Sequence, residues 1–117
     1  MLSDNTFPIK AGLWLCLAAG LVVTPVAAQR APTREQTLIR MVRQDCGSCH
    51  GMHLTGGLGP ALTPAALADK PVESLAATIY GGRPGTPMPP WKAMLSEAEA
   101  TWIAQKLLAG FPQEVRK

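Results

Sequence analysis

Residues 46–50 read Cys-Gly-Ser-Cys-His, and this stretch decides how the rest of the chain is interpreted. Two cysteines separated by two residues and followed directly by histidine form the attachment signature of c-type haem. Thiols three positions apart lie on one side of a helical turn, where they can add to the two vinyl groups of haem. The sequence therefore predicts one covalently bound haem c, with Cys46 and Cys49 as attachment points and His50 as the proximal iron ligand.

Three other interpretations of this motif have less support from the sequence. A thioredoxin-like redox pair requires a βαβ context, which the sequence lacks. A zinc site requires a fourth ligand beside Cys46, Cys49 and His50; His53 is the candidate, but so compact a set departs from the usual ligand spacing. A disulfide between the two cysteines closes a loop so short that it gains little entropy.

The second axial position of the iron has five candidates: Met41, Met52, Met88, Met94 and His53. Met52 and His53 follow His50 too closely to reach the opposite face. Met41 and Met94 fall in or near helical stretches, where methionine commonly fills gaps in the core. Met88 stands in a stiff proline-rich loop far along the chain. We therefore predict Met88 as the distal ligand and Met94 as the second candidate; a His/Met pair favours electron transfer over oxygen chemistry.

Short helices separated by loops account for the remaining pattern. The sequence predicts helices over residues 34–45, after Thr63, over 71–80 and from Ser96 to Gly110, with loops over 47–60 and 81–91. Thr33 with Gln36, and Ser96 with Glu99, have the spacing of capping boxes. Because no segment alternates apolar and polar residues as a strand does, the predicted fold class is all-α.

The N-terminal region has the order of a secretory signal peptide. An apolar run over residues 11–23 is too short to span a bilayer, Pro25 interrupts it, and small side chains precede a plausible cleavage site before Gln29. We therefore expect residues 1–28 to be the signal peptide and residues 29–117 to be a single haem domain in the periplasm. The alternative is an uncleaved N-terminal anchor; after cleavage no stable membrane insertion is expected.

Composition excludes several classes of function. The 117-residue chain has a formal net charge of +3, and its basic residues form no stripe or cluster of the kind that binds nucleic acid. Three cysteines are too few for a disulfide scaffold. The sequence shows no acid–base or nucleophile pair, so we predict an electron-transfer protein rather than an enzyme, and a monomer.

The chain resembles a class I cytochrome c in the residues already quoted, in Gly59-Pro60-x-Leu62 and in Met88-Pro89 between two terminal helices. The resemblance implies a small monohaem fold with several short helices around the haem. It also implies that the carbonyl of Pro60 accepts a hydrogen bond from His50, which orients a metal-bound imidazole. In this family the first and last helices cross, so Leu38 and Val42 are expected to meet Trp102, Ile103 and Leu107.

Residues 54–64 and 82–91 are similar to the small NirC-type cytochromes of nitrite-reductase operons, and to the haem domain of NirN proteins. That resemblance implies electron transfer in denitrification, with donation to cytochrome cd1 nitrite reductase. The alternative is an electron acceptor or accessory protein in haem d1 maturation, which makes a haem d1-handling protein the partner. A third hypothesis, a five-coordinate gas sensor, applies if Met88 does not bind the iron.

Three polar side chains flank the loop that holds Met88. The guanidinium of Arg83 can pair with a haem propionate, and the indole N–H of Trp91 is a further candidate donor because a buried indole N–H usually finds a partner. Tyr80 is a weaker candidate for the same role.

Overall fold

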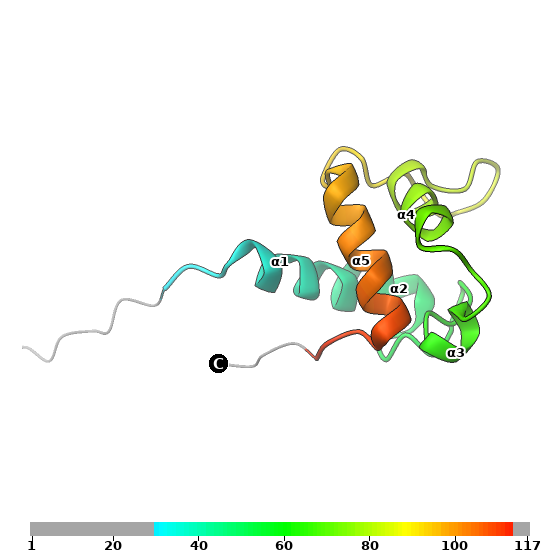
Figure 1. Ribbon diagram of the computed structural model, residues 1–117, viewed down its shortest axis with the longest axis horizontal. Helices are drawn as coiled ribbons and strands as arrows, with labels where there is room; N and C mark the ends of the chain where they lie inside the picture. Colours follow the sequence, from blue (N-terminus) through cyan, green and yellow to red (C-terminus); the bar gives the residue numbers. More distant parts are fainter. Residues whose placement is uncertain (1–29, 114–117) are drawn as a thin grey trace, which may run out of the picture.

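The computed structural model describes residues 30–113, so the predicted signal peptide and the last four residues lie outside the described part. Within residues 30–113 the chain forms helices and no strand (Figure 1). The helices are α1 (Arg34–Met41), η1 (Val42–Cys46), α2 (Gly47–His50), α3 (Pro64–Leu67), α4 (Val72–Gly81) and α5 (Glu97–Ala109). The prediction of an all-α fold is confirmed.

The first helical segment is longer than the sequence predicted. We expected an end near Asp45 and a loop from Gly47, but helical backbone continues through His50, with a single π turn in η1. Gly47 is buried and adopts helical angles (φ −61°, ψ −25°). The glycine that ends the segment is Gly51, whose φ of +91° is unfavourable for other residues. Both cysteines and the histidine of the motif therefore lie on helical backbone.

Both predicted capping boxes are present. The hydroxyl of Thr33 accepts from the Gln36 N–H at 3.2 Å, and the Gln36 side chain accepts from the Thr33 N–H at 2.9 Å. Ser96 and Glu99 repeat the arrangement at 3.2 and 2.8 Å. Each box satisfies N–H groups that a first helical turn leaves without partners, which explains why α1 and α5 begin where the sequence predicts.

The core joins the two ends of the described chain. Leu38 and Val42 share one buried cluster with Ile103 and Leu107 of α5, and Trp102 packs against this cluster. Leu54, Leu67 and Leu95 complete it. Figure 1 shows α5 crossing the segment that begins with α1, with α4 beside α5. The residues that the family resemblance expected to meet therefore belong to, or pack against, one buried cluster.

A buried arginine fixes the segment that follows α5. Arg43 is 8% exposed, and its guanidinium donates to the carbonyl of Phe111 at 2.7 Å and to that of Pro112 at 3.0 and 3.1 Å. It also lies 5.5 Å from the centroid of the Phe111 ring, which meets Trp102 edge-on. Because a buried charge needs partners of this kind, the C-terminal segment is held against η1.

An ion pair connects the first turns of α1 and α5 and gives stability a defined pH dependence. The Arg34 guanidinium donates to Glu99 at 2.6 and 3.0 Å, and this hydrogen bonding lowers the pKa of Glu99 from 4.5 to about 2. A carboxyl with a lowered pKa in the folded state stabilises the fold above its unfolded pKa. We expect this contribution to be lost as the pH falls from 4.5 towards 2, as measured by denaturant unfolding at a series of pH values.

Glu99→Gln isolates this charge effect, because glutamine also completes a capping box, as Gln36 does in α1. The variant should be less stable than the wild type at neutral pH, and the difference should shrink as the pH falls through that window. An equal pH dependence in the two proteins would show that the Arg34 pair contributes nothing.

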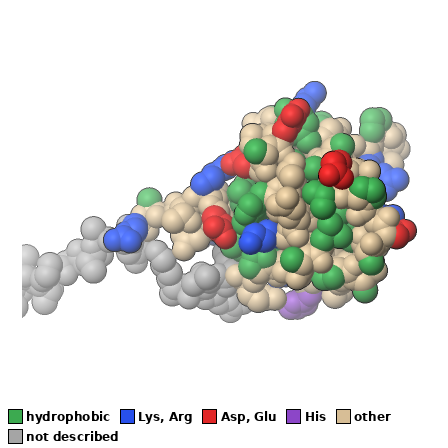
Figure 2. Space-filling model, in the orientation of Figure 1, with side chains coloured by type: hydrophobic (Ala, Val, Ile, Leu, Met, Phe, Trp, Pro, Cys, Tyr) green, Lys and Arg blue, Asp and Glu red, His purple; other side chains and the backbone are tan. Residues whose placement is uncertain are grey.

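The surface carries scattered charges and few large apolar side chains. On the face drawn in Figure 2, acidic and basic side chains are dispersed rather than gathered by sign. Among residues 30–113, the exposed large apolar residues are Met52, Leu58 and Met94. The prediction that Met94 belongs to the core is wrong: the residue is 50% exposed and lies in the turn before α5. None of the helices between residues 30 and 113 is long and apolar enough to cross a membrane.

Candidate functional site

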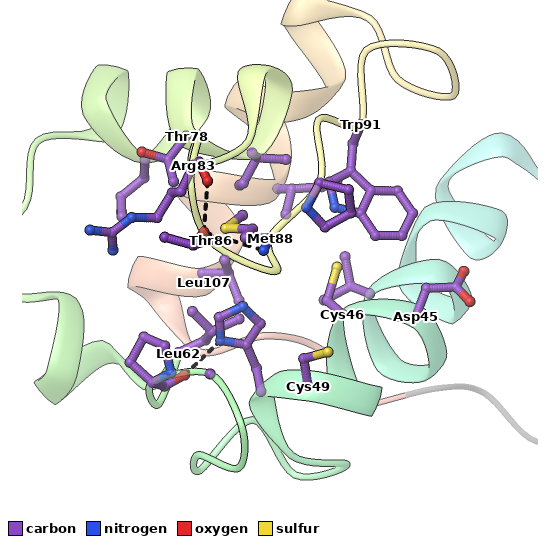
Figure 3. Close-up of a pocket in the computed structure, with 18 of the residues that line it drawn as sticks. Asp45, Cys46, Cys49, Leu62, Thr78, Arg83, Thr86, Met88, Trp91 and Leu107 are labelled. Carbon is purple, nitrogen blue, oxygen red and sulfur yellow. Dashed lines mark hydrogen bonds between the residues drawn. The ribbon is translucent and has the colours of Figure 1, made fainter.

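A cavity of about 450 Å³ opens between the α2 turn, α4, α5 and the loop over residues 82–91. Cys46 and Cys49 lie at one side and Met88 lies across the space from them (Figure 3). The walls are mainly apolar and include Val42, Leu62, Leu67, Leu75, Ile79, Ile103 and Leu107. Side chains from every described helix except α1 therefore line this one cavity.

The structure brings the predicted site residues together at this cavity. Those that line it are Cys46, Cys49, His50, Pro60, Arg83, Met88 and Trp91. Five residues weighed from the sequence are not among the lining residues: Met41, Met52, His53, Tyr80 and Met94. His53 is exposed, so the side chain proposed as a fourth zinc ligand is not grouped with the two thiols.

The two cysteines are three positions apart on one continuous helical segment, Cys46 at the end of η1 and Cys49 in α2, and neither is in a disulfide. Both are half-buried at the cavity. Burial raises the pKa of the Cys46 thiol to about 11, because a thiolate is poorly solvated in apolar surroundings. Before haem is attached, Cys46 is therefore a protonated thiol at neutral pH, facing an apolar space.

His50 is oriented from two sides. Its Nδ1 lies 2.7 Å from the carbonyl oxygen of Pro60. Since a carbonyl only accepts, Nδ1 carries a proton, which in a neutral ring leaves the lone pair on Nε2. Gly59 lies directly against the ring, because a Cβ there would be 2.8 Å from Cε1 and 2.9 Å from Nδ1. The Gly59 N–H donates to the carbonyl of Cys49 at 2.7 Å, and this hydrogen bond holds the loop at Gly59 against α2.

The Met88 loop is fixed to the end of α4. The Arg83 N–H donates to the Met88 carbonyl at 3.1 Å, and the Trp91 N–H donates to the Ile79 carbonyl at 3.3 Å. Gly82 has a φ of +68°, and a Cβ there would lie 2.9 Å from the Met88 carbonyl oxygen. The sequence alone gives no sign of this close approach, because it depends on how the loop over residues 82–91 folds back on the end of α4.

Arg83 and Trp91 occupy different sides of the cavity. In Figure 3, Arg83 and Thr78 lie on the side away from Cys46 and Cys49, whereas Trp91 lies on the same side as Cys46. A positively charged group therefore stands opposite the two thiols.

The chemistry of these groups fits a haem. Two thiols on one turn, an imidazole with a free Nε2 and a thioether sulfur surround an apolar hollow, and haem c requires two thiol attachments, an axial histidine and an apolar pocket. Cys46, Cys49 and His50 would hold the group on one side and the Met88 loop would cover the other.

Comparisons with known proteins agree with this fit. The family described as "Cytochrome C oxidase, cbb3-type, subunit III" matches residues 33–105. Cytochrome c55X of Pseudomonas aeruginosa is 52% identical over 101 residues, which cover 84% of this chain and 85% of that protein. The solved c-type cytochrome NirC is 56% identical, with a TM-score of 0.66 over 69% of this chain and 95% of that structure.

A larger enzyme contains a similar region. Dihydro-heme d1 dehydrogenase of Pseudomonas aeruginosa is 33% identical over 99 residues, which cover 84% of this chain but only 19% of that protein. The likeness to this enzyme is thus confined to one segment of it, whereas the small cytochromes match along most of their length. The chain belongs to the cbb3-type subunit III family of c-type cytochromes, is of the NirC type, and has its haem c site at Cys46 and Cys49.

Proposed function

We propose that this chain is a periplasmic single-electron carrier with one haem c, whose iron is bound by His50 on one face and Met88 on the other. The observation that supports this most is that both side chains line one apolar cavity from different segments of the chain. When bound, the haem supplies a one-electron couple at its iron, and a methionine and histidine pair raises the reduction potential.

Each residue of the site has a defined part in this proposal. The hydrogen bond from His50 to Pro60 keeps Nε2 directed at the iron and raises the basicity of the ring. The apolar walls exclude water. In haem the two propionates leave the edge opposite the two vinyl groups, so Arg83, opposite the thiols, is the propionate partner that this arrangement favours. Trp91, beside Cys46, is the second candidate.

We propose cytochrome cd1 nitrite reductase as the electron acceptor in denitrification. The similarity to NirC and to cytochrome c55X supports a place in this pathway. Dispersed surface charges argue against strong electrostatic steering. The exposed apolar side chain of Leu58 at the cavity rim suits the small contact area of a transient redox encounter.

A second candidate function is the acceptance of electrons during haem d1 maturation. The similarity to part of a dihydro-heme d1 dehydrogenase favours it. Oxidation of a dihydro compound releases two electrons and two protons, so each reaction would consume two oxidised copies of a one-electron carrier. In this reading the chain performs no catalysis and pairs with an enzyme that holds the tetrapyrrole.

Met88→Ala tests the ligand proposal, with Met94→Ala as the matched control because Met94 is exposed and does not line the cavity. We expect the weak long-wavelength absorption band of a methionine–iron bond in the oxidised wild type and in the Met94 variant. The band should be absent from the Met88 variant, whose reduced form should bind carbon monoxide rapidly because one axial position is open.

Two results would contradict the proposal. A wild-type protein without the band, whose reduced form binds carbon monoxide readily, would favour the gas-sensor hypothesis. Persistence of the band in the Met88 variant would assign the sulfur ligand elsewhere. Stopped-flow reduction of cytochrome cd1 by the reduced protein, compared with electron uptake from a dihydro-heme d1 dehydrogenase reaction, then separates the two partner proposals.

A further inference from the structure

We propose that the side-chain hydroxyl of Thr86 is the positioning group for the Met88 sulfur. This inference rests on the proposed role of Met88 as the distal ligand. It adds Thr86 as a residue that would act on the iron only through Met88. Thr86 lies at the rim of the cavity, on the loop that faces the two cysteines (Figure 3).

The hydroxyl of Thr86 bridges two points of the backbone. It donates to the carbonyl of Arg83 at 2.7 Å and accepts from the Met88 N–H at 3.3 Å. The Thr86 N–H also donates to the Arg83 carbonyl at 3.1 Å. This closes a four-residue turn in which Gly85 has a φ of +77°, as the third position of a type II turn requires. The turn therefore delivers the hydroxyl to Met88 at a fixed distance.

Because the stretch from residue 87 to residue 90 is mostly proline, this hydrogen bond is the only one that a backbone N–H between these residues can donate. Residues 87, 89 and 90 are prolines, which have no N–H to donate. Between residues 87 and 90, Met88 alone carries a backbone donor, and Thr86 accepts it. The Met88 carbonyl is held separately by the Arg83 N–H at 3.1 Å. With both polar groups of its backbone engaged, the Cα of Met88 is held at a fixed place beside the cavity.

Loss of the hydroxyl should free the Met88 N–H and remove the hydroxyl's bond to the Arg83 carbonyl. The Thr86 N–H still donates to that carbonyl and closes the turn. Thr86→Val keeps the volume and branching of the side chain but removes the acceptor, while Thr86→Ser keeps the acceptor. Because a neutral hydrogen bond is worth enough to shift such an equilibrium roughly three- to tenfold, the open form of the distal site should become more populated by that factor in the valine variant.

The test measures carbon monoxide binding to the reduced holoprotein, together with its reduction potential. We expect roughly three- to tenfold faster binding in Thr86→Val and a lowered reduction potential, with near wild-type values in Thr86→Ser. Thr101→Val is the matched control, because its hydroxyl donates to the Glu97 carbonyl within α5, away from the loop. A hydroxyl that only supported the turn through the Arg83 carbonyl would leave both the binding rate of carbon monoxide and the reduction potential unchanged.

A second measurement needs no variant. Hydrogen exchange of the Met88 amide in the wild-type protein should be slowed relative to an unstructured peptide, and exchange at the unprotected rate would overturn the inference. Unchanged binding of carbon monoxide and an unchanged potential in Thr86→Val would overturn it as well. If these results occur while Met88→Ala still loses the long-wavelength band, the ligand proposal stands and only the role of Thr86 falls.

Discussion

A variant with both Cys46 and Cys49 replaced by alanine is expected to lose covalent haem and, with it, cooperative folding. The reason is that the haem cavity is large relative to the size of the protein. Without haem, the mainly apolar walls of this open space of about 450 Å³ face water, and each Å² of apolar surface left exposed forfeits about 25 cal/mol of stabilisation. A small domain has only about 5–15 kcal/mol of stability in all, so the walls must collapse or the chain must unfold.

Circular dichroism and denaturant unfolding check this prediction. The double variant should lose near-ultraviolet signal and show a broad transition, while Ser48→Ala, on the same helical turn but exposed, should keep its haem and unfold as the wild type does. A double variant that unfolds sharply near the wild-type midpoint would show that the protein part supports its fold alone.

Gly59→Ala is expected to lower the free energy of unfolding of the haem-loaded protein by about 1–3 kcal/mol, the cost of adding a carbon atom to a packed site. The added Cβ would stand 2.8 Å from Cε1 of His50. The ring cannot yield easily, because its Nδ1 is bonded to the Pro60 carbonyl. Either this bond lengthens or the loop moves, so the imidazole resonances of the variant should shift as well.

Gly81→Ala is the matched control. Gly81 is at the end of α4 and a Cβ there would meet nothing within 4 Å, so the same substitution should be neutral or slightly stabilising. Chemical unfolding of the three proteins under one set of conditions gives the comparison. Equal midpoints for the Gly59 variant and the wild type would show that the ring has room to move.

The helix starts were predictable from sequence because their signals are local. The capping boxes at Thr33 and Ser96 place a side chain and its backbone partner within one turn. The end of the first helical segment was not predictable. Gly47 and Gly51 are both glycines, and only tertiary contacts decide which of them ends the helix. Gly51 packs so closely against Gly56 that a Cβ would lie 2.6 Å from its carbonyl oxygen.

In the candidate site, too, features with local sequence signals could be predicted, whereas features that depend on tertiary contacts could not. The residues of the Cys46–His50 motif are adjacent in sequence, so their shared location could be predicted, and the Met88 loop was identified by its prolines. The contact of Gly59 with His50 and the hydrogen bond of Thr86 to Met88 depend on how loops fold back, and no periodicity or composition carries that information. Met94 was misassigned because an apolar residue outside a periodic segment gives no signal of the side it faces.

The pairing of Arg34 with Glu99 has a consequence for the order in which the fold is completed. The two residues are 65 positions apart, and α5 also supplies Ile103 and Leu107 to the cavity walls. Contacts so remote in sequence form only after the intervening chain has closed into a loop, which costs entropy. We therefore expect the wall that α5 supplies to form late, so that the site stays open to haem until the last helix docks.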